Sequence, residues 1–314
     1  MENTPVFPVA LITGGSRGLG LLIARELMPR GYRVAVCART KDDLERAVDE
    51  LSEMGVARGY VCDVGDTDAV AAMVGDIEAD LGPIDVLFNV AGIIQMAPSE
   101  SVTIEHFRSS IDSMIWGLIN TTWAVLPGMR ERRRGAIGNI TSLGGFVAPP
   151  HMLPYTTAKF GAVGFSDGLA AELAGTGVTA TTIVPGMLRT GSQERALFAG
   201  PVEKQFALFS AAASLPFMSM DADRAARIIV RGVLSGRPLV FVGWMPRVAA
   251  RVRGLFPGLT TRAMGLIGGL MPQTKPGQNE TVEGRVARGR LDSPIVDAVT
   301  TLGLRAAERN NQLG

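Results

Sequence analysis

The sequence predicts an α/β domain with a doubly wound parallel sheet, and three observations lead to this prediction. Short β-branched runs alternate with helical patterns over residues 9–184, a glycine-rich turn follows the first run, and no polar linker appears before about residue 272. Strict alternation of strand and helix, with right-handed crossovers, places helices on both faces of a parallel sheet. Ligands of such sheets bind beyond the carboxyl ends of the strands.

The elements follow one another in that order along the chain. Apolar, β-branched runs predict six strands, at residues 9–13, 33–37, 60–62, 84–89, 136–141 and 178–184. Helical patterns between the runs predict helices at residues 18–30, 42–53, 67–81 and 104–133, and a further helix that carries Tyr155 and Lys159. The helix at 18–30 begins at the glycine-rich turn, and the helix at 42–53 is charged.

Composition and charge exclude several classes of function. The chain has 314 residues, 46% hydrophobic and 19% charged, and its net charge of +1 gives no global field for nucleic acid. Cys37 and Cys62 end strand-like runs and are expected to be buried, reduced thiols of a cytoplasmic protein. Two histidines without metal-ligand spacing argue against a metal site, and the first residues lack the basic start of a signal peptide. The apolar run at 113–129 is too short for a comfortable bilayer span and predicts a buried helix.

The glycine-rich turn TGGSRGLG (residues 13–20) indicates a phosphate-binding site. Gly14, Gly18 and Gly20 allow a tight turn and a close approach of the backbone to a phosphate, and the helix that follows offers free N–H groups. The spacing differs from the G-x-G-x-x-G fingerprint. The signal therefore depends on the position of the turn after the first strand.

The end of the second strand favours NADP(H) over NAD(H). An acid usually holds the ribose diol of NAD at this point, whereas an arginine accommodates a 2′-phosphate. Here Arg39 follows the strand, no carboxylate appears before Asp42, and Arg17 is a second cation nearby. The alternative is a pair of solvated arginines. Asp63, after the third strand, is a candidate partner of the adenine amino group or a plain turn-initiating residue.

Five motifs in register resemble the short-chain dehydrogenase/reductase family over residues 6–245. They are the glycine turn, NVAG at 89–92, NITS at 139–142, YTTAK at 155–159 and VPGMLRT at 184–190. The resemblance implies a single-domain Rossmann fold, hydride transfer with NADPH/NADP+ and a homodimer or homotetramer. It places a catalytic domain at 1–245, with a substrate lid at about 190–220, before a C-terminal helical extension and polar tail at 246–314.

The resemblance also assigns roles to residues. Tyr155 exchanges a proton with the substrate oxygen, and Lys159 together with the nicotinamide charge lowers the pKa of the phenol. Lys159 also holds the ribose, and Ser142 positions the substrate oxygen, although a strand-end cap is the plain alternative for Ser142. The expected cofactor contacts are Gly14, Ser16, Arg17, Gly18, Leu19, Gly20, Arg39, Asp63, Val64, Asn89, Gly92, Tyr155, Lys159, Pro185, Gly186 and Thr190.

Met114 departs from the family pattern. The resemblance implies an asparagine there, which supports a water that links the lysine to solvent. A thioether cannot replace the paired donor and acceptor of an amide. A backbone carbonyl or Ser110, one turn earlier, is a candidate substitute. The variation is either tolerated or indicates a slower enzyme or an unusual substrate.

Two other functions compete with an NADPH-dependent oxidoreductase. Residues 164–168 spell G-x-S-x-G, but helix precedes Ser166 and both histidines come before it, so the chain order of a hydrolase is absent. The second alternative is a non-catalytic NADPH-binding sensor or structural partner. Met114 favours it, and the intact set of Ser142, Tyr155 and Lys159 argues against it.

The lid and the segment after it suggest the partners. Aromatic and methionine side chains between Leu197 and Met218 predict either a dry lid over a small lipophilic carbonyl or alcohol, or helices packed on the sheet. Met96, His151, Met152 and Met187 are the expected substrate-pocket residues. Residues 244–272 combine apolar side chains with Arg247, Arg251, Arg253 and Arg262. No Asp or Glu occurs between residues 244 and 279. Two helices broken at Pro257 and packed on the domain or a second subunit are expected, with peripheral contact to an anionic membrane as the alternative. A last helical pattern lies near 293–308.

Overall fold

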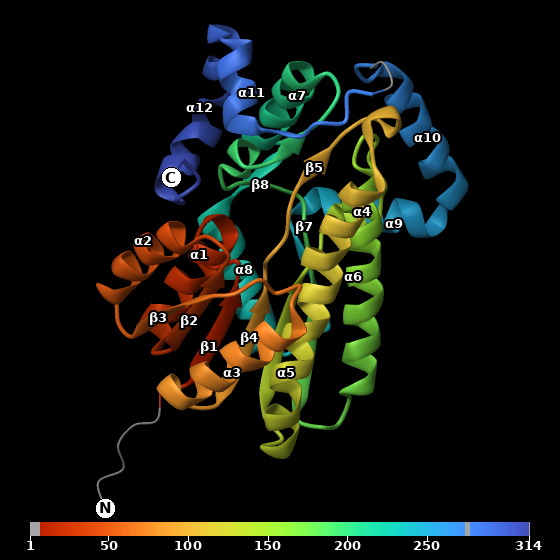
Figure 1. The fold of residues 1–314 in the computed structure, drawn as a ribbon. Helices are drawn as coiled ribbons and strands as arrows, with labels where there is room; N and C mark the ends of the chain where they lie inside the picture. The colour runs from red at the N-terminus through yellow and green to blue at the C-terminus, as the bar shows by residue number, and fades with distance from the viewer. Residues whose placement is uncertain (1–6, 274–276, 314) are drawn as a thin grey trace, which may run out of the picture.

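The computed structural model describes residues 7–273 and 277–313. Residues 1–6 of the expected catalytic domain, and residues 274–276 and 314 of the expected C-terminal extension, lie outside the described residues. The centre of the fold is a seven-stranded parallel sheet in the order β11-β7-β6-β4-β1-β2-β3 (Figure 1). The strands are β1 (Val9–Thr13), β2 (Arg33–Ala38), β3 (Ala57–Val61), β4 (Ile84–Asn89), β6 (Gly135–Ile140), β7 (Val178–Pro185) and β11 (Leu239–Val242).

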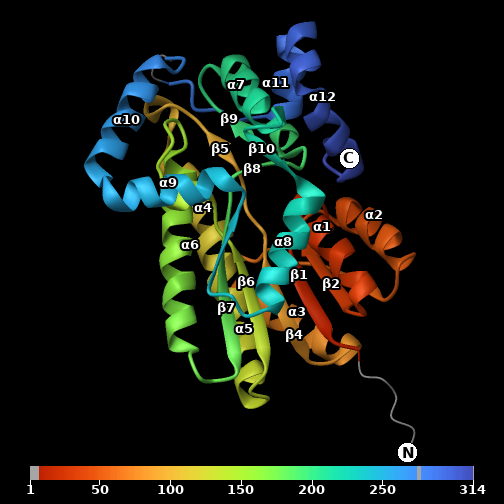
Figure 2. The same cartoon turned by 180° about the vertical axis from the view of Figure 1, so that it is seen from behind.

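Helices cover both faces of this sheet, as Figures 1 and 2 show from opposite sides. One face carries α1 (Gly18–Leu27), α2 (Lys41–Ser52) and α8 (Ala222–Leu234). The other carries α3 (Thr67–Leu81), α5 (Gly117–Glu131) and α6 (Leu153–Glu172), and α4 (Ile104–Ile111) packs against α6. Alternate residues of β1 serve the two cores: Ala10 and Ile12 pack on the first face, Val9 and Leu11 on the second. The doubly wound α/β prediction is therefore confirmed.

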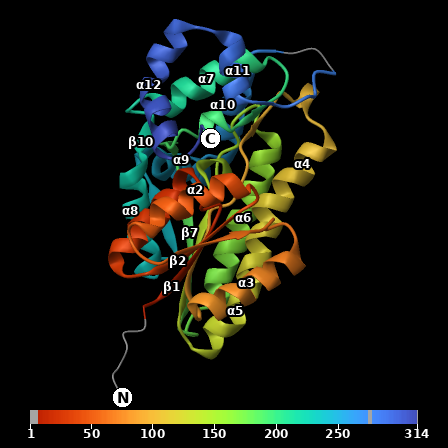
Figure 3. The ribbon, with the colours of Figure 1, turned by 60° about the vertical axis from the view of Figure 1, so that its left-hand side comes forward.

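The lid lies above the carboxyl ends of the strands (Figure 3). It contains β8 (Met187–Arg189), β9 (Leu197–Phe198), α7 (Val202–Ser214) and β10 (Ser219–Asp221), with β5 (Gln95–Met96) beside it. Short 3-10 turns occur at Met28–Arg30, Ser99–Ser101, Leu143–Gly145 and Ser192–Glu194. Phe198 packs edge-to-face on Phe206 and Phe209, with ring centroids 5.9 and 6.0 Å apart. The aromatic residues thus form a small core of the lid itself.

The chain beyond β11 divides into two parts. The first is a pair of helices, α9 (Trp244–Leu255) and α10 (Pro257–Leu270), broken at Pro257 as expected. The second part runs through β12 (Val282–Glu283), α11 (Gly284–Leu291) and α12 (Pro294–Arg309), and β12 pairs with β9 of the lid. The helical pattern expected near 293–308 is α12.

All six predicted strands are present within three residues of their expected limits, and β11 is a seventh that the sequence reading missed. The predicted helix at 104–133 is interrupted by a π-helical turn at Asp112–Trp116. Cys37 and Cys62 are buried and unpaired, as expected. No helix among the residues described here is both long enough and apolar enough to cross a membrane.

Candidate active site

Ser142, Tyr155 and Lys159 meet where β6 ends and α6 begins. Ser142 directly follows β6, and its Oγ accepts a hydrogen bond of 3.0 Å from the Gly144 N–H, so it caps the turn that leads towards α6. A Cβ on Gly144 would lie 3.0 Å from the Tyr155 ring, and one on Gly145 would lie 2.7 Å from the Lys159 carbonyl oxygen. Two glycines therefore let this loop approach α6 closely.

The lysine and the tyrosine lie on one face of α6. Lys159 Nζ is 5.8 Å from the centroid of the Tyr155 ring and donates a 2.8 Å hydrogen bond to the Ile140 carbonyl oxygen. Lys159 is only 6% exposed, and burial lowers the pKa of its ammonium to about 8. The ammonium thus has one main-chain acceptor in an otherwise dry environment.

In the protein alone the pKa of Tyr155 is raised, whereas the expected lowering included the charge of the nicotinamide. Burial raises the pKa of the phenol, and the hydrogen bond with Ser142 opposes that rise only in part. Lys159 does not lower the phenol pKa in the protein alone, because its Nζ is directed to Ile140. A cationic nicotinamide ring would act in the lowering direction.

Met114 lies beside Lys159 on the π-helical turn. A Cβ on Gly92 would lie 3.2 Å from Met114 Sδ and 3.9 Å from Lys159 Nζ, so the three residues are neighbours. Met114 is 2% exposed and borders the cleft. Ser110 does not serve as a substitute, because its hydroxyl is buried and donates a 2.9 Å hydrogen bond to Gln95 Oε1.

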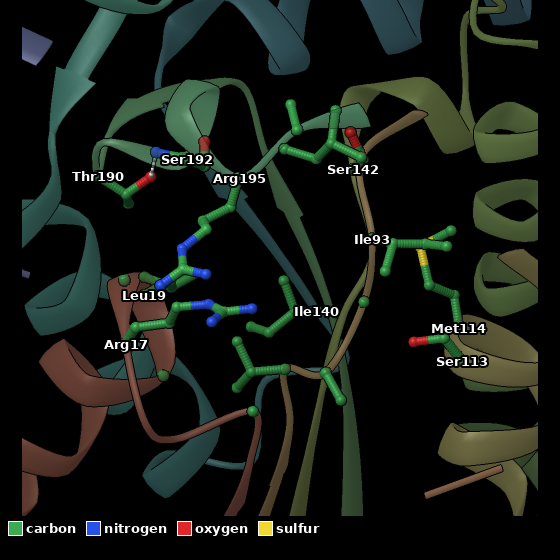
Figure 4. Close-up of a pocket in the computed structure, with 18 of the residues that line it drawn as sticks. Arg17, Leu19, Ile93, Ser113, Met114, Ile140, Ser142, Thr190, Ser192 and Arg195 are labelled. Atoms are coloured by element: carbon green, nitrogen blue, oxygen red, sulfur yellow. Dashed lines mark hydrogen bonds between the residues drawn. The ribbon is translucent and has the colours of Figure 1, made fainter. Parts of the chain in front are cut away.

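One cleft of about 400 Å³ joins the triad to the glycine turn. Figure 4 shows part of its lining, with Arg17 and Leu19 on one side and Ser142 and Met114 on the other. Its lining includes every predicted cofactor residue except Asn89. Asn89 is buried behind it, where its side chain bonds Thr121, Thr122 and Asn139 and so ties β4 to α5 and β6. Asn89 therefore supports the cleft wall rather than contacting a ligand.

The predicted substrate residues divide into two groups. Met152 and Met187 line the cleft, together with apolar side chains that include Ile94, Leu143 and Phe209. Met96 instead packs in the lid core, and His151 lies outside the lining, where its carbonyl accepts a 2.7 Å bond from Ala97. The cleft lining therefore does not include Met96, because β5 pairs with β9 and carries it into the lid core, nor His151, although Pro149 and Met152 on either side of it line the cleft.

The nucleotide end of the cleft is built around a buried carboxylate that we did not predict. Asp43, whose side chain is 3% exposed, accepts a 2.6 Å bond from Arg17, pairs with Arg46 and lies 3.6 Å from Arg195. Figure 4 shows the guanidinium groups of Arg17 and Arg195 side by side on the wall opposite Met114. Three cations around one carboxylate leave an excess of positive charge.

Arg39 and Asp63 complete this end of the cleft. They form an exposed pair 3.9 Å apart, and Asp63 Oδ1 also accepts a 3.0 Å bond from the Gly65 N–H. Asp63 therefore acts as a turn residue here, while both side chains still border the cleft. Arg17 is not a solvated cation, because Asp43 fixes its position.

The end of the chain also reaches the cleft, and no sequence signal indicated it. The Gly18 N–H donates a 2.8 Å bond to the Asn310 carbonyl, and Asn311 Nδ2 donates to the carbonyls of Ser16 and Asp43 at 2.8 and 3.0 Å. Gln312 lines the cleft itself. We name Asn310–Gln312 the C-terminal clasp.

The cleft fits an elongated, phosphate-bearing dinucleotide. A Cβ on Gly14, whose φ is +65°, would lie 2.9 Å from Ala91 Cα, and one on Gly20 would lie 2.2 Å from the Gly14 carbonyl oxygen. Only glycine allows so tight a turn at the start of α1. The N–H of Gly18 is engaged by Asn310, so the N–H groups that would face an anion are the next ones of the first helical turn. The turn, the arginines Arg17, Arg39 and Arg195, and the triad all line one cleft.

Comparison with known proteins finds similar dehydrogenases and reductases. The family model described as short chain dehydrogenase matches residues 8–197. An acetoacetyl-CoA reductase of Paracoccus denitrificans is 42% identical over 182 residues, 58% of this chain and 74% of that protein. The structure of an actinorhodin polyketide ketoreductase with NADPH is 32% identical, with a TM-score of 0.65 over 75% of this chain and 95% of that one. A short-chain dehydrogenase from Streptomyces avermitilis has a TM-score of 0.70 at 26% identity, over 83% and 99%.

Proposed function

This chain belongs to the short-chain dehydrogenase family of oxidoreductases, and we propose that it reduces a keto group of a mainly apolar substrate with NADPH. The observation that carries this proposal is the convergence of Ser142, Tyr155 and Lys159 on the cleft that also holds the glycine turn. Oxidation of the corresponding alcohol is the reverse of the same reaction. The family match ends before the lid is complete, so the substrate is a separate question.

The residues divide the chemistry among them. When bound, the nicotinamide supplies the hydride. Tyr155 gives its phenolic proton to the carbonyl oxygen of the substrate, and Ser142 donates a hydrogen bond that holds this oxygen in place. Lys159 holds the ribose hydroxyls and places positive charge beside the phenolate that forms. Lys159 is buried, whereas Ser142 and Tyr155 are partly exposed towards the cleft from which a substrate would approach.

The preference for NADPH rests on the charges at the nucleotide end. Arg17, Arg39 and Arg195 border the cleft, and the one buried carboxylate among them, Asp43, is engaged by Arg17 and Arg46. A 2′-phosphate would meet an excess of positive charge there. We expect Arg39→Asp to shift the preference towards NADH, and an unchanged ratio of NADPH to NADH activity would remove Arg39 from the phosphate site.

The substrate class follows from the apolar part of the lining. Ile94, Met152, Met187 and Phe209 contribute apolar side chains to the lining of the cleft. Besides Lys159, the charged lining residues in the described part of the chain are Arg17, Arg39, Asp63 and Arg195. Relatives named for acetoacetyl-CoA and polyketide reduction support a ketone next to an acyl chain. A panel of ketones, aldehydes and quinones, with NADPH oxidation as the measurement, would rank these substrates.

Substitution of Tyr155 tests the mechanism. We expect Tyr155→Phe to lower kcat at least a thousandfold while NADPH still binds, because the acid is lost and the cleft keeps its shape. Tyr60→Phe, at a phenol that bonds Asp80 on the surface, is the matched control and should retain full activity. Substantial turnover by Tyr155→Phe would contradict the mechanism.

The alternative of a non-catalytic NADPH-binding protein rests on Met114. The thioether next to Lys159 leaves the ammonium without the expected polar neighbour. If the wild-type protein binds NADPH but reduces no member of the panel, the alternative is supported. We expect Met114→Asn to raise kcat if the missing amide limits proton return.

We also propose a homodimer or homotetramer. Trp123 and Phe160, on the outer faces of α5 and α6, are 58% and 40% exposed, and exposed aromatic side chains are typical of subunit interfaces. Analytical ultracentrifugation of the wild-type protein and of Trp123→Ser measures the assembly. A monomeric wild type would contradict this proposal.

A further inference from the structure

The two helices α9 and α10, which we name the hairpin, expose apolar stripes rather than burying them. On α9, Trp244, Val248, Val252 and Leu255 recur at helical spacing and are 63, 49, 43 and 74% exposed. On α10, Leu259, Leu266 and Leu270 are 64, 76 and 88% exposed, and none of its residues is buried. A surface helix of a globular protein normally turns its apolar stripe inward.

Arginines flank these stripes, and no acid balances them. Arg247, Arg251, Arg253 and Arg262 lie on the hairpin, and the sequence has no Asp or Glu between residues 244 and 279. Exposed leucine and tryptophan beside arginine is the pattern of a helix that lies in the plane of an anionic lipid surface.

A second cleft, of about 410 Å³, continues the basic surface next to α9. Arg224, Arg227 and Arg231 line it from α8, Arg237 from the turn before β11, and Arg247 from α9. Within residues 7–273 and 277–313, no ion pair engages any of these five guanidinium groups. A phosphate headgroup has the charge and the oxygen acceptors that such a cleft would bind.

The hairpin is attached close to the mouth of the active-site cleft. A Cβ on Gly186, in the cleft wall, would lie 3.1 Å from Pro246 of α9, and one on Gly268 of α10 would lie 3.4 Å from Pro150. Pro150 follows Pro149, which lines the cleft, and Met271 packs on the lid core. Figure 2 shows α9 and α10 projecting beyond the helices that cover the sheet.

We propose that the hairpin and the arginine-lined cleft dock this protein on a membrane that contains anionic lipid. The apolar stripes enter the headgroup region, and the arginines contact lipid phosphates. A second copy of the chain fits this surface less well, because an isologous contact would oppose arginine to arginine with no acid in the segment to pair them. A ketone dissolved in the bilayer would then reach the cleft mouth directly.

Flotation with vesicles tests the docking. We expect the wild-type protein to float with vesicles of phosphatidylcholine and 30% phosphatidylglycerol at low salt, to bind at least tenfold less to pure phosphatidylcholine, and to be released by about 0.5 M NaCl. Leu266→Ser with Leu270→Ser should abolish flotation, and Arg227→Gln with Arg231→Gln should weaken it about tenfold. Ile104→Ser, at a 67% exposed position on α4, is the matched control and should float like the wild type.

Two results would overturn the proposal. One is a wild-type protein that does not float with anionic vesicles at low salt. The other is flotation that the hairpin variants leave unchanged. If flotation fails and ultracentrifugation shows that Leu266→Ser with Leu270→Ser dissociates an oligomer, the hairpin is instead an interface between copies of the chain.

The C-terminal clasp carries a second inference, because its hydrogen bonds join the glycine turn to the lid. Asn311 bonds Ser16 and Asp43 on the nucleotide side, whereas the Asn310 amide donates to the Thr190 carbonyl at 3.2 Å on the lid side. The carbonyl oxygen of Gln312 accepts a 2.9 Å bond from Arg195 Nε. The clasp therefore spans the two sides of the cofactor cleft.

Gln312 points to a ligand at this position. It is 5% exposed and lines the cleft, and its amide oxygen is buried without a hydrogen-bond partner within the described residues. Its Nε2 lies 2.5 Å from where a Cβ on Gly18 would be, directly over the start of α1. We infer that the clasp retains the dinucleotide by joining the lid to the glycine turn, an inference that rests on the proposed NADPH-dependent function.

The rate of NADPH release tests the clasp. We expect Asn311→Ala to release NADPH about tenfold faster in a stopped-flow fluorescence experiment, because three hydrogen bonds of the clasp are lost, and a chain ending at Glu308 to release it faster still. Leu313→Ala, one residue beyond the clasp, is the matched control and should behave like the wild type. Unchanged or slower release from both clasp variants would overturn the inference. A wild-type protein that does not bind NADPH would overturn the proposed function as well.

Discussion

The two parts of the chain beyond β11 are similar in composition but differ in how much of each is buried against the rest of the molecule. Both contain short amphipathic helices with arginines and small residues. In the second part, Ala287, Ala306 and Ala307 are fully buried against the lid, whereas α10 in the hairpin has no buried residue. Proximity in the chain therefore does not determine which segment joins the core.

The space around the glycines differs between the two parts in the same way. A Cβ on Gly191 of the lid would lie 2.3 Å from Ala307 Cα of α12, and one on Gly284 of α11 would lie 1.8 Å from the Gln193 carbonyl oxygen. In the hairpin, Gly254, Gly265 and Gly269 have no atom within 4 Å of such a Cβ. Close backbone contact fastens the second part to the lid, and its absence leaves the hairpin surface open to another partner.

The largest predicted change in stability comes from disrupting the contact between the lid and α12. Gly191→Ala places a methyl group against the backbone of α12 at a residue whose φ is +84°, and we expect it to lower the free energy of unfolding by about 3 kcal/mol. Chemical denaturation measures this change. Gly175→Ala, with a φ of +79° and open space around its Cβ, is the control and should cost about 1 kcal/mol. Equal losses in the two variants would show that the contact with α12 contributes nothing.

An intermediate effect concerns the charge buried under the covered part. Glu194 is 0% exposed, and its carboxylate lies 3.7 Å from Arg288 of α11; burial nevertheless raises the pKa of this carboxyl. The folded state therefore binds its proton more tightly than the unfolded state, and the stability of the wild type should fall as the pH rises from about 4 through the raised pKa.

We expect Glu194→Gln to stabilise the fold by about 1 kcal/mol at pH 7, and to do so less as the pH approaches 4. Thermal unfolding of both proteins across this pH range measures the difference. A gain that is independent of pH would show that the carboxylate charge is not its origin.

The smallest predicted effect lies in the open part. Gly265→Ala adds a methyl group that meets nothing, so helix propensity alone should stabilise α10 by about 0.5–1 kcal/mol. Gly75→Ala, in α3 with an equally open environment, is the matched control for denaturant titration. A loss of stability in Gly265→Ala but not in Gly75→Ala would indicate that another surface covers the hairpin in solution, as the lid covers α12.

Much of the sheet could be predicted because its signals are local. The helix at Thr67–Leu81 and the strand at Ile84–Asn89 occur at the predicted residues, since β-branched runs and helical periodicity are properties of neighbouring residues. β11 was missed because it lies beyond residue 184, where the series of predicted strands ended. The π-helical turn that carries Met114 was missed because it changes no periodicity that a short window can detect.

The site was predicted in outline and completed by long-range contacts. Motif positions were sufficient to bring Ser142, Tyr155, Lys159 and the glycine turn to one cleft. Asp43, Arg195 and Gln312 could not be predicted as its members, because each reaches the cleft through packing between distant segments. For the same reason Met96 was assigned to the pocket although it lies in the lid core.

The sequence by itself determined the doubly wound fold, the family and the order in which the candidate catalytic residues occur. Only the tertiary structure decided which charges surround the glycine-turn end of the cleft, that burial raises the pKa of Tyr155 in the protein alone, and which part of the C-terminal region is covered. The physical reason is that pattern and motif act over a few residues, whereas burial and charge pairing depend on every segment that packs at the same place.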